Sequence, residues 1–126
     1  MTISELVKQA HENATDKGWY DEPKTFGELI ALCHSELSEA LEEFRAGFDI
    51  DKPLYECPHG DCINGEVEDC ADCEDGKPCG IPIELADVVI RVADMCGYYG
   101  IDLESAIKIK MEYNKTRPYK HGGKVI

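Results

Sequence analysis

Apolar residues recur every three or four positions in four stretches of the chain, which is the spacing of helices that bury one face. Residues suited to helix N-caps precede three of these stretches, and they are Thr2 or Ser4, Thr25 and Asp102. The expected limits of the stretches are, in chain order, residues 2–17, Phe26 to Gly47, Pro82 to Gly97 or Gly100, and Asp102 to Pro118. The pattern predicts an all-α fold of four helices, forming a single domain over residues 1–126.

Residues 48–81 interrupt this pattern between the second and third helices. The segment shows no sustained apolar period and is rich in the residues that break helices, namely Gly60, Gly65, Gly76, Gly80, Pro53, Pro58 and Pro78. We therefore expect an irregular insertion here, with no strands anywhere in the chain, and an extended tail after Pro118.

Acidic residues outnumber basic ones by 26 to 13, which gives the chain a formal net charge of −13. This excess argues against nonspecific nucleic-acid binding, because such binding depends on a basic face that neutralises phosphates. The charge is also uneven. Residues 49–80 carry ten acids and two bases, whereas residues 108–126 carry six bases and one acid.

The chain holds no apolar run of the roughly 18 residues that a membrane-spanning helix needs. Its first residues, from Met1 to Glu5, lack both the basic start and the apolar stretch of a signal peptide. From these features we expect a cytoplasmic protein that is not embedded in a membrane.

Five of the seven cysteines fall within the insertion, and they are Cys57, Cys62, Cys70, Cys73 and Cys79. The first four offer thiolates of the kind that binds zinc tetrahedrally, with His59 as a spare ligand. Reduced thiols on an acidic loop and redox-active pairing are the two other interpretations. Cys33 and Cys96 lie in apolar helical stretches, where a free cysteine acts as a small buried side chain.

Two acidic pairs, each spaced three residues apart, lie on the second and third expected helices. At about 100° per residue, Glu36 and Glu39 project at roughly 300° and 240° from Cys33, beside an apolar stripe centred near 20° that we expect to be buried. Glu84 and Asp87 project at roughly 260° and 200° from Leu85 by the same geometry.

Side-by-side packing of these two helices would bring four carboxylates together, and they would repel one another unless a cation lay among them. Carboxylate oxygens suit a hard cation, Mg²⁺ or Mn²⁺, better than zinc. The competing interpretation is that these acids are solvated surface residues.

The basic end of the chain offers a complement to such a centre. Lys110, Asn114 and Arg117 share one face of the fourth expected helix, and Lys120 and its neighbours extend the positive charge. Metal-bound carboxylates beside cationic side chains are typical of phosphoryl chemistry. Bases near a helix C-terminus also suit the helix dipole, which is the alternative explanation.

These residues together resemble one known family. The segments Glu36-Leu37-Ser38-Glu39 and Glu84-Leu85-Ala86-Asp87, followed by Lys110, Asn114 and Arg117, are similar to the motifs of MazG-like all-α nucleoside triphosphate pyrophosphohydrolases. The similarity covers residues 24–47 and 81–124. The chain departs from the family pattern in the insertion, since 44 residues separate Glu39 from Glu84.

The resemblance implies a helical bundle that forms a dimer or tetramer, with Mg²⁺ held by Glu36, Glu39, Glu84 and Asp87. It implies phosphates held by Lys110, Asn114 and Arg117. The implied reaction is cleavage of an NTP or dNTP to a monophosphate and pyrophosphate. One of the carboxylates, or Glu43, would orient or deprotonate the water.

Two further features leave alternatives open. Apolar residues around Tyr98, Tyr99 and Ile101 suggest a surface that a second copy covers, so we expect a homodimer. Trp19 or Tyr20 would stack on a nucleobase or serve as a structural anchor. The competing function, from a different class, is a noncatalytic helical interaction module with a zinc-stapled loop.

Overall fold

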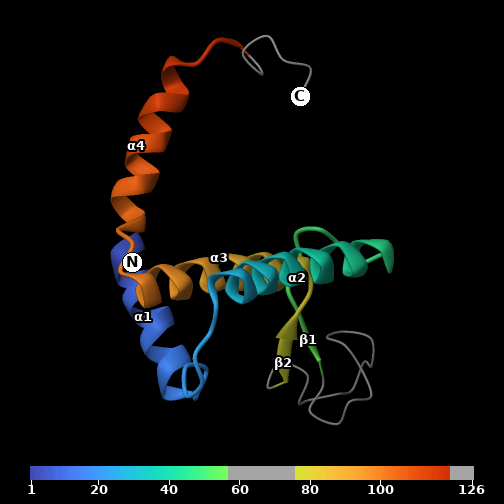
Figure 1. Cartoon of the computed structure of the whole chain (residues 1–126). Coiled ribbons are helices and arrows are strands. Elements are labelled where there is room, and N and C mark those ends of the chain that lie inside the picture. The colour runs from blue at the N-terminus through green and yellow to red at the C-terminus, as the bar shows by residue number, and fades with distance from the viewer. Residues whose placement is uncertain (57–75, 120–126) are drawn as a thin grey trace. The chain divides into compact units, whose positions relative to one another are not determined.

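A computed structural model describes residues 1–56 and 76–119 (Figure 1). These residues form four helices and one small two-stranded sheet, which confirms the all-α fold class. The helices are α1 (Ile3–Asp16), α2 (Phe26–Arg45), α3 (Ile81–Tyr99) and α4 (Leu103–Thr116). None of them is long and apolar enough to cross a membrane.

The helix starts lie where the capping residues predict them. Thr2 and Thr25 each accept a hydrogen bond from the backbone N–H three residues later, and Glu5 and Glu28 bond back to the cap residues' N–H groups. Asp102 caps α4. Such reciprocal bonds satisfy N–H groups that a helix start otherwise leaves without partners.

The insertion contains strands, so the expectation of a strand-free segment is wrong. Strands β1 (Leu54–Glu56) and β2 (Lys77–Cys79) pair antiparallel, with Leu54 opposite Cys79 and Glu56 opposite Lys77. Three residues are too few to show the alternation that identifies a strand in a sequence. Pro78 is tolerated because both strands of a two-stranded ribbon are edge strands.

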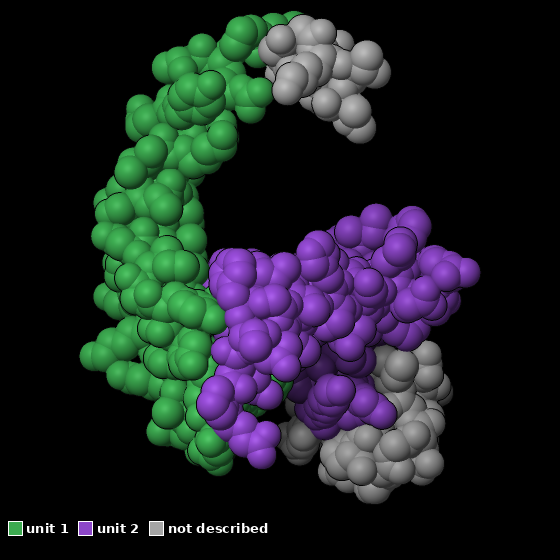
Figure 2. Space-filling model, viewed as in Figure 1, with its two compact units in different colours: residues 1–21, 93–126 green, residues 22–92 purple. Residues whose placement is uncertain are grey.

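The chain divides into two compact units (Figure 2). Unit 1 comprises residues 1–21 and 93–126, and unit 2 comprises residues 22–92. The boundary falls inside α3, so this helix contributes its first part to unit 2 and its last part to unit 1.

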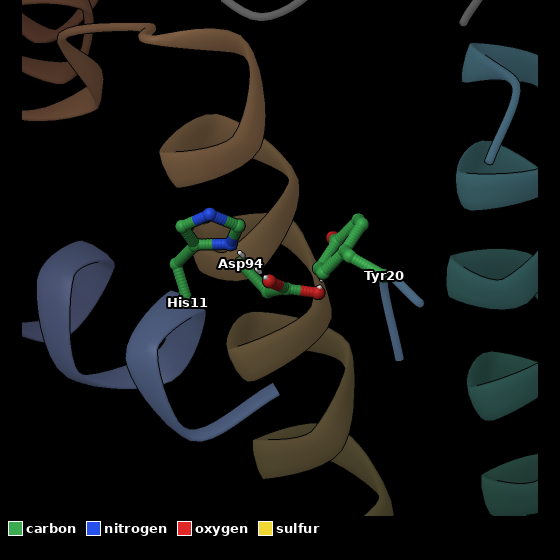
Figure 3. Close-up of polar contacts among 3 residues, drawn as sticks. All are labelled: His11, Tyr20 and Asp94. Atoms are coloured by element: carbon green, nitrogen blue, oxygen red, sulfur yellow. Dashed lines mark hydrogen bonds and ion pairs between the residues drawn. The ribbon is translucent and has the colours of Figure 1, made fainter. Parts of the chain in front are cut away.

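Unit 1 is built around a buried carboxylate, Asp94 (Figure 3). The Tyr20 hydroxyl donates to its Oδ2 at 2.7 Å, and Nδ1 of His11 lies 2.9 Å from its Oδ1. The Tyr20 ring stacks on Tyr98 with 4.4 Å between ring centroids. Burial and the bond to Asp94 raise the pKa of Tyr20, so it remains a hydroxyl donor. Tyr20 thus acts as a structural anchor.

In unit 2, the inward side of α2 carries apolar residues together with one buried acid, Glu36. Leu29, Glu36 and Ala40 are buried, with 6–7% of their surface exposed. The predicted apolar stripe of α2 is divided: Leu29 and Ala40 are buried as expected, whereas Leu37, Leu41 and Phe44 are 47%, 57% and 54% exposed. Glu36 is buried, so the expectation that it lies at the edge of a buried stripe is wrong.

Helix α3 repeats this arrangement within unit 2. Its apolar residues Leu85, Val89 and Ile90 are 44–53% exposed, whereas Glu84 and Asp87 are half-buried. An amphipathic helix has an apolar stripe about 100° or more wide. One partner helix covers only part of such a stripe, so the exposed apolar residues of α2 and α3 remain available to pack against another surface.

Gly97 lies inside α3 rather than at its end, and α1 approaches it closely in unit 1. A Cβ atom built on Gly97 would lie 2.5 Å from the Cβ of His11 and 3.3 Å from the carbonyl oxygen of Val7. The helix continues past Gly97 to Tyr99 and ends before Gly100, whose φ is +67°. Gly97 therefore permits the contact between the two helices.

We expect Gly97→Ala to lower the free energy of unfolding by about 1–3 kcal/mol, the usual cost of an overpacked contact. Gly27→Ala is the matched control, since Gly27 also lies in a helix but has no atom within 4 Å of its built Cβ. The control should be neutral or stabilising, because alanine favours the helix. Equal effects of the two substitutions in denaturant unfolding would contradict the close approach.

Candidate metal centre

Three carboxylates converge within unit 2. Glu36 and Glu39 of α2 and Glu84 of α3 each offer an oxygen, and these oxygens lie within 4.8 Å of one another. Glu36 is buried, Glu84 is half-buried and Glu39 is exposed, so the cluster extends from the helix interface to the surface. Three of the four acids suggested by the sequence are thus brought together.

The helical geometry explains this convergence. Glu36 and Glu39 are three residues apart and therefore neighbours on one side of α2. Glu84 lies in the first turn of α3. The tight turn before it is possible because Gly80 adopts a φ of +100°, a backbone conformation that favours glycine.

Asp87, the fourth predicted acid, is not part of the converging group. It is half-buried, and burial raises the pKa of its carboxyl, with a further contribution from the charge of Glu36. Asp87 therefore lies within the electrostatic reach of the cluster, and its role as a ligand stays a prediction.

Arg91 is a member of the centre that the sequence analysis missed. Its Nε donates to Oε1 of Glu36 at 2.6 Å, and the two side chains are 25% and 7% exposed. The signal was present in the sequence, because Arg91 is the one basic residue of α3 and lies two turns after Glu84. A single arginine on the side of α3 that carries Glu84 and Asp87 suggests an acidic partner on the neighbouring helix, which here is Glu36.

The pKa values of Glu36 and Glu84 are shifted in opposite directions. Burial disfavours charge on Glu36, but the hydrogen bond from Arg91 and those shared with Glu39 and Glu84 outweigh it and lower its pKa. Burial, together with the hydrogen bond to Glu39 and the charge of Glu43, raises the pKa of Glu84 to about 7. Without a cation, a proton on Glu84 thus relieves the repulsion between the carboxylates.

A pocket of about 350 Å³ opens beside the cluster. Its lining residues are mostly acidic and are Ser38, Glu39, Glu42, Glu43 and Glu84. Such a lining repels a bare anion, so a phosphate group would enter only together with cations. Carboxylate oxygens from two helices match the donor preference of Mg²⁺ or Mn²⁺.

The predicted phosphate-binding residues belong to unit 1. Lys110, Asn114 and Arg117 are exposed on or directly after α4, and Nζ of Lys110 lies 5.0 Å from the ring centroid of Tyr113. Lys120 lies outside the described residues. Their binding role stays a prediction.

The proposed zinc ligands Cys57, Cys62, Cys70 and Cys73, together with His59, also lie outside the described residues. Of the described cysteines, Cys33 and Cys79 are free thiols. Cys96 is buried as expected, and Cys33 is half-buried. Burial and the charge of Glu43 raise the pKa of Cys79, which disfavours the reactive thiolate.

No protein-family model, curated protein or solved structure matches this chain.

The raised pKa of Glu84 predicts a pH-dependent stability. Between its ordinary pKa of 4.5 and about 7, the folded protein holds a proton on Glu84 that the unfolded chain has lost. The contribution of Glu84 to the free energy of unfolding therefore falls as the pH rises through this interval. Glu84→Gln removes the titrating group, so the free energy of unfolding of the variant should rise relative to that of the wild type from pH 5 to 8.

Denaturant unfolding with a chelator present measures this difference. Glu42→Gln is the control, because the Glu42 side chain lines the same pocket but is 68% exposed. A difference between Glu84→Gln and wild type that stays constant from pH 5 to 8 would rule out the raised pKa.

Proposed function

We propose that the chain is a Mg²⁺-dependent nucleoside triphosphate pyrophosphohydrolase of the MazG-like all-α kind. The observation that carries this proposal is the convergence of Glu36, Glu39 and Glu84 from two helices beside an open acidic pocket. Repelling carboxylates held together by a fold are typical of a cation site. Mn²⁺ would substitute for Mg²⁺, since it accepts the same oxygen ligands.

The three carboxylates, with Asp87 as a fourth ligand, would hold the metal. When bound, Mg²⁺ supplies positive charge against the phosphate oxygens and lowers the pKa of coordinated water. Arg91 keeps Glu36 ionised and fixes its orientation through the 2.6 Å hydrogen bond. The acidic pocket excludes unaccompanied anions, which restricts the site to metal-bound phosphates.

In the proposed reaction, the oxygen of water forms a bond to the α-phosphorus of an NTP or dNTP. The bond from that phosphorus to the bridging oxygen breaks in line, and pyrophosphate leaves with the bonding pair. A carboxylate of the centre accepts the proton lost by the water. Lys110, Asn114, Arg117 and Lys120 are proposed to bind the phosphates. The reaction belongs in the cytoplasm, where such nucleotides are found.

Substitution of a single ligand tests this function. We expect Glu39→Gln and Asp87→Asn to reduce Mg²⁺-dependent pyrophosphate release by at least about 100-fold, the scale of losing one electrostatic contribution in the transition state. Helicity by circular dichroism should remain unchanged. The assay uses the common and modified triphosphates with Mg²⁺, and Glu12→Gln, at an exposed acid outside unit 2, serves as the control with full activity. Undiminished turnover in both ligand variants would reject the assigned site.

The proposal includes self-association into a homodimer or tetramer. The apolar stripes of α2 and α3 are exposed in unit 2, and Tyr98, Tyr99 and Ile101 are 38–43% exposed in unit 1. Exposed apolar side chains that line one face of a helix, as in each unit, usually mark an interaction surface. A second copy would supply an identical stripe, as in an isologous dimer.

Light scattering on the wild type and on a variant of the α2 stripe tests the proposed self-association. We expect the wild type to be at least dimeric at micromolar concentration and Leu41→Lys to shift it towards monomer. The reason is that Leu41 is 57% exposed in the single chain, so lysine would disrupt the contact between copies rather than the fold. Ala31→Lys, at an exposed position of α2 outside the stripe of Leu37, Leu41 and Phe44, is the control. A monomeric wild type would contradict the proposal.

The same exposed stripe favours a second candidate function, a noncatalytic interaction module whose cysteine-rich segment binds zinc. This alternative predicts that no triphosphate is hydrolysed with any divalent metal. It also predicts that zinc co-purifies in a stoichiometric amount, which elemental analysis measures. Pyrophosphate release that depends on Glu39 would reject it.

A further inference from the structure

Glu43 lies one turn after Glu39 on α2 but is not one of the three converging acids. Its Oε1 accepts a hydrogen bond from the backbone N–H of Gly80 at 3.4 Å. Gly80 directly precedes α3, the helix that carries Glu84. Glu43 therefore joins the last turns of α2 to the start of α3.

The other carboxylate oxygen of Glu43 is buried without a hydrogen-bond partner in the described part of the chain. Among the described residues, Oε2 of Glu43 is the one buried side-chain oxygen or nitrogen that has no hydrogen-bond partner. Burying an unsatisfied polar atom costs about 1–3 kcal/mol, and more for a charged group. A buried polar atom without a partner calls for an explanation, such as a functional role of Glu43.

Gly80 occupies a position that leaves little freedom. Its φ is +100°, and a built Cβ would lie 3.0 Å from the carbonyl oxygen of Lys52. Its own carbonyl oxygen accepts from the N–H groups of Ile83 and Glu84, both at 3.0 Å. A shift of Gly80 would thus be passed directly to the backbone of Glu84.

We propose that Glu43 is a positioning residue of the acidic centre, which holds the N–H of Gly80 and so fixes the first turn of α3 with Glu84 facing Glu36 and Glu39. The inference rests on the proposed metal centre and adds to it a residue outside the ligand set. A carboxylate beside a helix N-terminus is also favoured by the helix dipole, which helps to retain Glu43 there.

The charge of Glu43 agrees with this placement. It is one of the causes that raise the pKa of Glu84, so the two carboxylates lie close enough to interact. Both also line the same pocket. Glu43 acts on the centre through Gly80 and need not contact the metal.

Metal affinity and backbone protection together test the proposal. The probe is Mn²⁺ alone, titrated into the full-length protein and followed by the electron paramagnetic resonance of the free ion. We expect Glu43→Ala to weaken Mn²⁺ binding by about 10–100-fold, the usual effect of removing a group that orients a metal ligand. Hydrogen exchange at the amides of Ile83 and Glu84 should become faster in the same variant.

Glu43→Gln separates positioning from charge, because its amide oxygen can still accept from Gly80 while the negative charge is gone. We expect it to bind Mn²⁺ within about threefold of wild type, since the second-shell contact is kept. Glu12→Ala, at an exposed acid outside unit 2, is the control and should bind as wild type does. Circular dichroism confirms that each variant is folded.

Two results would overturn the inference. Mn²⁺ binding in Glu43→Ala equal to wild type would show that Glu43 does not position the centre. Equal weakening in Glu43→Gln and Glu43→Ala would show that its charge acts directly, as a ligand's would. If the wild type binds no Mn²⁺, the proposed function fails, and unchanged amide exchange in Glu43→Ala would then reject the positioning role separately.

Discussion

Crowding of carboxylates between α2 and α3 is the constraint on which the rest of unit 2 depends. Glu36 is buried at this interface, where an uncompensated charge would cost several kcal/mol. The guanidinium of Arg91 compensates Glu36, and the protonation of Glu84 relieves the remaining repulsion. In the proposed function, a cation among Glu36, Glu39 and Glu84 would replace that proton.

This inward placement of acids has a consequence for the outer faces of the same helices. When α2 directs Glu36 and Ala40 inward, its period places Leu37, Leu41 and Phe44 outside. Few monomeric proteins leave such a continuous apolar stripe exposed. The proposed metal centre and the proposed self-association thus have one structural origin, because one orientation of the helices produces both.

Local features of the chain were predictable from the sequence because they depend on few neighbours. Thr2, Thr25 and Asp102 cap their helices through bonds to residues three positions later. Helical spacing also placed Glu36 and Glu39 on one side of α2, and their convergence with Glu84 was expected if the two helices packed side by side. Helical period shows which residues share a face but not which face meets a neighbour, and for this reason the burial of Glu36 and the exposure of Leu41 were not foreseen.

Other features depend on contacts between distant segments and left no local signal. β1 and β2 are three residues each and far apart in the chain, so they show no alternation. The bond between Glu43 and Gly80 spans 37 positions. Arg91 is the exception, since a single base on the acidic side of α3 could have indicated its partner.

Crystallographic location of Mn²⁺ tests the central claim most directly. Crystals of the wild-type protein grown with millimolar Mn²⁺ should show an anomalous difference peak among the carboxylate oxygens of Glu36, Glu39 and Glu84, and this peak should be lost in Glu36→Gln. Anomalous density elsewhere, with none among these three carboxylates, would contradict the account.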